Sequence, residues 1–99
     1  MHSYLVNASI QILPLAQDKH PYEWVDEAIA IIQASGLSYT VNAFSTEIEG
    51  SYSQVVNLYN AINEHLQKRT CHEWIANLQI QIRANEDMRG EEKTGKYKS

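Results

Sequence analysis

Two carboxylates separated by one residue are the first candidates for chemistry in this chain of 99 residues. Glu47 and Glu49 flank Ile48, and in a β-strand residues i and i+2 lie on one face, about 7 Å apart. Such a pair either exchanges protons as a general acid and base or attracts a cation. The alternative is a solvated strand edge, where both carboxylates contact only water.

The neighbouring Cys71 and His72 are a second candidate, because an imidazole beside a thiol favours the reactive thiolate. We expect a structural role for them instead, since they fall in a predicted connection between a helix and a strand. Cys71 is the only cysteine of the sequence, which excludes an internal disulfide and a multi-cysteine metal cluster. The spacing of His65, Cys71 and His72 does not match a zinc site. We therefore predict no catalytic residue, no metal ligand and no cofactor.

The elements that must position these residues follow from the hydrophobic pattern. Alternation of apolar and polar residues predicts four strands, over residues 4–13, 39–44, 45–49 and 74–83. Apolar residues at spacings of three and four predict two helices, over residues 22–35 and 51–68. Gly36 is expected to cap the first helix, and Gly50 to end the third strand. Ser51 and Gln54 form a capping-box pattern at the start of the second helix.

The order of these elements is βαββαβ, which predicts the α+β class and a ferredoxin-like sandwich. Right-handed crossovers give a four-stranded antiparallel sheet of strand order 4-1-3-2, with both helices on one face. Tyr22 and Trp24, in the first turn of the first helix, are expected to be core or staple residues and not residues that stack on a ligand. Residues 1–84 are predicted to form this single domain, and residues 85–99 a polar C-terminal tail that is flexible or docked on a partner.

The uncovered face of the sheet is rich in amides and hydroxyls, which favours a surface where partners bind. A merely solvated polar face is the alternative. An RNA-recognition domain would need two or three stacking aromatics and a basic surround on this face. Phe44 is the only aromatic residue there, so we reject that function. The outward residues are Asn7, Ser9, Gln11, Thr40, Asn42, Phe44, Glu47, Glu49, Asn77, Gln79 and Gln81.

Charge and composition exclude further classes of partner. The chain has 8 Lys and Arg against 12 Asp and Glu, a net charge of −4, so binding a nucleic-acid backbone would gain little from counterion release. No apolar run approaches the ~18 residues that cross a bilayer, and no signal peptide is visible, so we expect no membrane contact. With a single cysteine, these features predict a cytoplasmic location.

Four stretches of the sequence resemble the thiamine-binding, YkoF-like family of small proteins. They are VNASIQILPL at residues 6–15, YEWVDEAI at 22–29, SGLSY at 35–39 and NAFSTEIEG at 42–50. The Thr-x-Ile-Glu-Gly run from Thr46 to Gly50 is the most typical of the family. The resemblance implies a ferredoxin-like fold, a homo-oligomer (dimer or tetramer) formed through the sheet face, and non-enzymatic binding of thiamine or its hydroxymethylpyrimidine moiety.

The resemblance also implies which residues bind the ligand. Thr46 and Glu49 match the family's motif and are the first choices. An aminopyrimidine needs a carboxylate or an amide for its donor–acceptor edge and an apolar or aromatic wall for its ring. We expect Glu47 near the cationic thiazolium and predict that loss of the Glu49 carboxylate weakens thiamine binding at least about tenfold. The remaining candidates are Phe44, which would stack on a ring, and Ser9, Gln11 and Asn42, which would hydrogen-bond it.

Two other functions stand beside thiamine binding. One is an oligomeric regulatory or scaffold domain whose open face makes only protein contacts. A stable tetramer without ligand, and without a thermal shift from any thiamine-like molecule, would favour it. The other is an enzyme that acts on a small cationic metabolite through Glu47 and Glu49. It ranks last because no nucleophile or metal accompanies the two carboxylates, and we predict that the protein is not an enzyme.

Overall fold

The computed structural model describes residues 2–15 and 20–95 as four strands and three helices in one chain. The predicted tail therefore lies outside the described residues from position 96 onward. The elements in chain order are β1 (Leu5–Pro14), α1 (Pro21–Ala34), β2 (Ser38–Val41), β3 (Thr46–Ser51), α2 (Tyr52–Lys68), β4 (Trp74–Gln81) and α3 (Glu91–Thr94).

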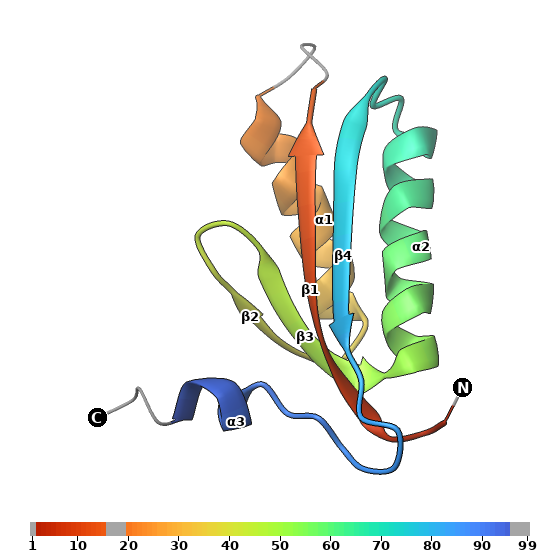
Figure 1. The fold of residues 1–99 in the computed structure, drawn as a ribbon. Coiled ribbons are helices and arrows are strands. Elements are labelled where there is room, and N and C mark those ends of the chain that lie inside the picture. Colours follow the sequence, from red (N-terminus) through yellow and green to blue (C-terminus); the bar gives the residue numbers. More distant parts are fainter. Residues whose placement is uncertain (1, 16–19, 96–99) are drawn as a thin grey trace.

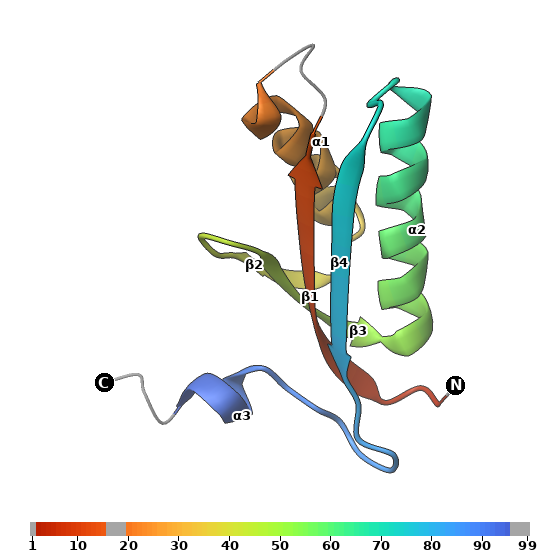
Figure 2. The ribbon, with the colours of Figure 1, turned by 45° about the horizontal axis from the view of Figure 1, so that its top comes forward.

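The strands form one antiparallel sheet of order β2-β3-β1-β4, which is the predicted order read from the opposite edge. Helices α1 and α2 lie side by side on one face of this sheet, as Figures 1 and 2 show. The short helix α3 lies on the other side, at the end of the sheet near the chain termini. The prediction of a ferredoxin-like α+β sandwich is confirmed.

Local signals in the sequence fix most element boundaries. Gly36 follows α1 with a φ of +76°, a left-handed conformation that glycine adopts without strain. The Ser51 hydroxyl accepts a hydrogen bond from the Gln54 backbone N–H, and the Gln54 side chain accepts one from the Ser51 backbone N–H. Both predicted caps are therefore confirmed.

The predicted C-terminal ends of the second and third strands are wrong. Gly50 does not end β3, because it is buried and pairs with Val6 of β1. It lies so close to Leu37 that an added Cβ would be 3.1 Å from the leucine Cδ2, which gives a packing reason for a glycine inside the strand. The second strand does not reach residue 44, because a turn that contains the hydrogen bond from Asn42 N–H to the Ser45 carbonyl follows Val41.

The core fills the space between the sheet and the two long helices. Trp24 is buried there, whereas Tyr22 is 73% exposed and is therefore not a core residue, the first of the two roles expected for it. Tyr22 lies two residues before Trp24 on α1, and since successive helical residues differ by about 100°, the two side chains leave the helix on nearly opposite sides. The core side chains are Val6, Ala8, Ile10, Ile12 and Ile48 from the strands and Trp24, Ala28, Ile32, Val55, Leu58, Ile62 and Leu66 from the helices.

After β4 the chain turns back and crosses the open face of the sheet. We call residues 86–95 the C-terminal strap. Met88, in its first half, is 1% exposed, and its backbone N–H donates a hydrogen bond of 2.9 Å to the Leu5 carbonyl. The Leu5 N–H in turn donates to Asp87 Oδ1 at 2.8 Å. The predicted tail thus packs on the chain's own first strand over its described residues, while its separation as a domain at residue 84 stays a prediction.

Candidate functional site

The open face of the sheet brings polar side chains together by strand pairing. In the β1–β3 ladder, Asn7 lies opposite Glu49 and Ser9 lies opposite Glu47. Asn7 Nδ2 donates a hydrogen bond of 2.9 Å to Glu47 Oε1. Asn7 is only 4% exposed although it lies on the open face, because the C-terminal strap covers it. The predicted orientation of these four residues toward the open face agrees with the observed register.

The C-terminal strap contacts both carboxylates of the predicted pair. The backbone N–H of Gly90 donates a hydrogen bond to Glu49 Oε1. At the same point, the Cα of Gly90 lies against Glu47 and Asn7, so that an added Cβ would lie well inside van der Waals contact with Glu47 Oε1. Because its φ of −59° is open to any residue, Gly90 is suited to this place by the space available and not by its backbone conformation.

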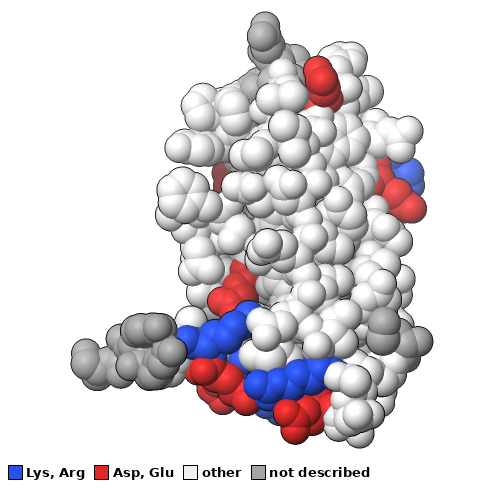
Figure 3. All heavy atoms as spheres, in the orientation of Figure 1, with Lys and Arg blue, Asp and Glu red and all other residues white. Residues whose placement is uncertain are grey.

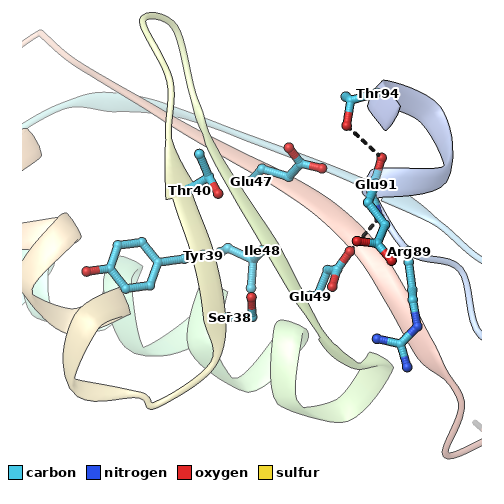
Figure 4. A pocket seen from close by; sticks show the side chains of 10 residues that line it. Ser38, Tyr39, Thr40, Glu47, Ile48, Glu49, Arg89, Glu91 and Thr94 are labelled. Carbon is cyan, nitrogen blue, oxygen red and sulfur yellow. Dashed lines mark hydrogen bonds between the residues drawn. The ribbon is translucent and has the colours of Figure 1, made fainter. Parts of the chain in front are cut away.

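A cavity of about 260 Å³ lies between the C-terminal strap and the β2–β3 hairpin. Figure 4 shows Glu47 and Glu49 pointing from β3 toward the strap, which contributes Arg89 and Glu91. Three carboxylates and one guanidinium give the lining a net negative charge, which favours a positively charged occupant over a negative one. The hydroxyl groups on its wall belong to Ser38, Tyr39, Thr40 and Thr94.

An open hollow over the middle of the sheet continues from this cavity, since Glu47 and Thr94 line both. Figure 3 views this face and shows mostly uncharged surface above the strap, with Lys, Arg, Asp and Glu gathered at the strap end. Amides and hydroxyls therefore form most of the polar surface beyond the carboxylates. The other residues that line the hollow are Asn7, Ala8, Ser9, Asn42, Ser45, Gln79, Ile80, Gln81 and Lys93.

A cleft of about 210 Å³ lies at the far end of the hairpin, between β1, α1 and the β2–β3 turn. It forms because β3 pairs with β1 only from Leu5 to Ile10, while β1 continues to Pro14. Within the described residues, the edge of β1 beyond Ile10 thus has no strand partner on this side. The cleft is lined mainly by apolar side chains, with Thr46 among its few polar ones.

The seven predicted ligand-binding residues are distributed along these adjoining spaces. Thr46 is 6% exposed and lies on the helix side of the sheet, on the opposite face from Glu47 and Glu49. Gln11, Asn42, Phe44 and Thr46 line the cleft, Ser9, Asn42 and Glu47 line the open hollow, and Glu47 and Glu49 line the strap cavity. Asn42 and Ser45 line both the cleft and the hollow, so the three spaces adjoin one another around the hairpin tip, and we call this series of adjoining spaces the path.

Sequence reasoning missed two contributors to these spaces. Tyr22 stands at the cleft with 73% of its surface exposed, whereas the sequence indicated a core or staple residue. Gly90 allows the strap to lie directly against the carboxylates. In the sequence it is a lone glycine in a polar segment, a pattern that is typical of any loop. Neither position is recognisable without knowing which segment lies opposite.

The other sequence candidates lie apart from this path. Cys71 is buried, and its thiol lies 3.8 Å from the Glu73 carbonyl, whereas His72 is exposed. His65 instead contacts Glu27 across the two long helices, Nε2 to Oε1 at 2.7 Å, with Arg69 Nε 3.2 Å from the same oxygen. Among the described residues, no group of three or more His, Cys, Asp or Glu side chains is arranged to hold a metal ion.

The distal part of the C-terminal strap is held by charged contacts. Arg83 Nη1 lies 3.0 Å from Glu92 Oε1, and the Arg89 backbone N–H donates to Glu92 Oε2 at 3.1 Å. The Arg89 N–H and the Arg83 guanidinium hold the pKa of Glu92 below its ordinary value. Lys93 Nζ donates a hydrogen bond of 3.0 Å to Gln81 Oε1 on β4.

Comparisons with known proteins agree with this architecture. A UPF0045 protein of Clostridium perfringens is 31% identical over 92 residues, which are 93% of this chain and 96% of that protein. A domain of unknown function (DUF77) from Bacillus cereus superposes with a TM-score of 0.91 at 29% identity, covering 97% of this chain and 92% of that one. A Thermotoga maritima protein, whose name proposes a part in thiamine biosynthesis or salvage, has a TM-score of 0.86 at 26% identity, covering 95% of this chain and 99% of that one.

No helix in the described part of the chain is both long and apolar enough to cross a membrane. The model of the thiamine-binding protein family matches residues 8–98, which include most of β1, the other three strands, both long helices and the C-terminal strap. This match covers most of the sequence and includes the second half of the fold beyond the four stretches at residues 6–50. The chain belongs to the thiamine-binding protein family.

Proposed function

We propose that this protein binds thiamine, or its hydroxymethylpyrimidine moiety, without chemical conversion of the ligand. The observation that carries the proposal is the path from an apolar cleft to a pair of carboxylates, in a chain of the thiamine-binding protein family. Thiamine is itself bipartite, a neutral aminopyrimidine joined to a cationic thiazolium. The two ends of the path differ in the same way.

The cleft suits the pyrimidine. Ile10, Ile32 and Val41 offer apolar walls, and Phe44, 84% exposed at the hairpin tip, is free to close over a ring. The Thr46 hydroxyl supplies a donor and an acceptor. The unpaired edge of β1 beyond Ile10 adds backbone N–H and C=O groups, which match the alternating donors and acceptors of an aminopyrimidine. A volume of about 210 Å³ fits one ring better than a whole two-ring ligand.

The carboxylate end suits the thiazolium. Glu47 and Glu49 lie on the open face, and among the described residues that line the hollow, only Lys93 of the strap carries a positive charge. An organic cation gains from such a site without needing defined coordination geometry, in contrast to a metal ion. The roles of Ser9, Gln11 and Asn42 as hydrogen-bond partners of the ligand belong to the same proposal.

We further propose that the working form is a homo-oligomer in the cytoplasm, a dimer or tetramer formed through the open sheet face. The support for this is the breadth of amide-rich surface beyond the strap, which a small domain would gain from burying. The same surface favours the second candidate function, a scaffold or regulatory domain that uses the face for protein contacts alone. Ligand binding separates the two.

The test is isothermal titration calorimetry with thiamine, thiamine phosphates and hydroxymethylpyrimidine, on protein of known oligomeric mass. We expect saturable binding with a stoichiometry tied to the oligomer. Glu49→Gln removes one charge at nearly constant shape and should weaken thiamine binding at least about tenfold, because charged contacts contribute more than neutral ones. The matched control is Glu64→Gln, the same change on an exposed position of α2, behind the sheet.

Flat titrations across all of these ligands would refute thiamine binding and favour the protein-contact domain. Equal affinity of the Glu49→Gln variant and the unaltered protein for thiamine would refute the assignment of the thiazolium to the carboxylate end. Turnover of any of the ligands during the titration would refute the proposal that the protein is not an enzyme.

A further inference from the structure

The C-terminal strap is attached to the sheet in two unequal parts. Its first part is anchored by the buried Met88 side chain and by the paired hydrogen bonds between Leu5 and residues 87–88. Its second part, from Gly90 to Gly95, is a single helical turn whose residues beyond Gly90 are exposed. A segment with few buried side chains opens at low free energy, whereas its anchor stays in place.

The two parts of the strap meet at Gly90, which contacts both Glu47 and Glu49. The Gly90 N–H donates to Glu49, and Asn7 Nδ2 donates to Glu47, so each carboxylate is already engaged by a donor of the chain itself. The lack of a side chain at Gly90 permits this approach, because an added Cβ would also lie 3.0 Å from Asn7 Nδ2. The strap therefore takes up an oxygen of Glu49 and borders the cavity in which a cation on Glu47 and Glu49 would lie, so the strap and the cation compete for the same carboxylate.

We propose that the C-terminal strap is an autoinhibitory element, which must leave Glu49 before the cationic part of a ligand binds there. The inference rests on the proposed function and adds a regulation of the same site. The neutral pyrimidine, bound in the cleft at the hairpin tip, does not compete with the strap. The strap thus lowers the affinity for the whole cation-bearing molecule and leaves the affinity for its neutral half unchanged.

The contacts that hold the distal strap are weak, so its closed and open forms are close in free energy. Arg83 with Glu92 and Lys93 with Gln81 are exposed pairs, which contribute little each and exchange readily with water. The apparent affinity of a ligand equals its affinity for the open form multiplied by the fraction of molecules that are open. If the strap is closed in about nine of ten molecules, its release raises the apparent affinity about tenfold. We expect an effect between about threefold and tenfold on thiamine binding.

The test uses Gly90→Ala in the full chain, with Gly95→Ala as its matched control. Both glycines have helical backbone angles, so alanine is accepted by the backbone at each, but a Cβ at Gly95 meets nothing within 4 Å. Since Glu47 could move aside from the new methyl group, Met88→Ala is a second variant that loosens the strap from its anchor. Thermal unfolding of each variant shows that the domain is folded.

Amide hydrogen exchange is the first readout and needs no ligand. In Gly90→Ala and in Met88→Ala, the amides of residues 88 and 90 should exchange at least about tenfold faster, and in Gly95→Ala they should not change. Calorimetry is the second readout. Both strap variants should bind thiamine more tightly than the unaltered protein, by the factor given above, and bind hydroxymethylpyrimidine equally well.

Each other result overturns the inference. Faster exchange with unchanged thiamine affinity would show that the strap does not compete, and weaker thiamine binding would show that the strap is part of the site. Unchanged exchange in both variants would show that the strap is not held by the contacts named. If the unaltered protein and all variants bind neither ligand, the proposed function itself is refuted, and the inference with it.

Discussion

Thr46→Val gives the sharpest test of the cleft, because it exchanges a hydroxyl for a methyl group and keeps the branched shape that a strand favours. Thr46 is 6% exposed, lies opposite Ile10 and Val41, and lines the cleft where we place the pyrimidine. The variant therefore removes one donor and acceptor from the cleft wall and changes its volume hardly at all.

The expected magnitude follows from one hydrogen bond. A neutral hydrogen bond contributes about 0.5–1.5 kcal/mol net, and about 1.4 kcal/mol corresponds to a tenfold change in affinity. Hydroxymethylpyrimidine and thiamine should thus both bind about threefold to tenfold more weakly, since both place a pyrimidine against the hydroxyl. The free energy of unfolding without ligand should stay within about 1 kcal/mol, because a buried methyl group needs no hydrogen-bond partner.

Calorimetry with hydroxymethylpyrimidine measures the effect, and urea unfolding measures the stability. Thr40→Val is the control, since it makes the same atomic change at an exposed residue of β2 that points to the opposite face, beside Glu47. Its affinity for hydroxymethylpyrimidine should be unchanged. Equal affinities for Thr46→Val and the unaltered protein would show that the pyrimidine does not contact this hydroxyl, and the cleft assignment would be wrong.

Two further predictions concern stability and pH. Ser51→Ala removes the N-terminal cap of α2 and should lower the free energy of unfolding by about 1 kcal/mol, which corresponds to a melting temperature lower by about 4–8 °C. The control Ser53→Ala, in the same turn, should leave both quantities unchanged. Since the pKa of Glu92 is lowered in the folded chain, its contribution is present above the unfolded pKa and is lost as the pH falls through the folded one. An NMR titration should therefore show the Arg89 amide shifting in that acid range, an effect that Glu92→Gln abolishes and Glu91→Gln keeps. A Ser51→Ala protein as stable as the original, or an Arg89 amide that titrates alike in both glutamine variants, would contradict these assignments.

The sequence by itself determined the fold, because each of its signals acts over a few neighbouring residues. Alternation in residues 5–13 and 74–81 requires one apolar face per strand, and the three- and four-residue spacing of α1 and α2 requires one apolar stripe per helix. Two apolar helix faces and one apolar sheet face are satisfied together only when the helices cover the same side of the sheet. The polar open face followed from that requirement, and the strand order followed from right-handed crossovers.

Tertiary structure alone decided how the candidate residues are grouped. The parity of β3 puts Thr46 behind the sheet and Glu47 in front of it, and only the early end of the β1–β3 ladder at Ile10 opens a cleft that Thr46 lines. The contact of Gly90 with Glu49 joins residues 41 positions apart, and no local pattern encodes it. Periodicity specifies which face a side chain takes, whereas the meeting of distant segments depends on packing, since loop closure leaves their relative placement open until the core forms.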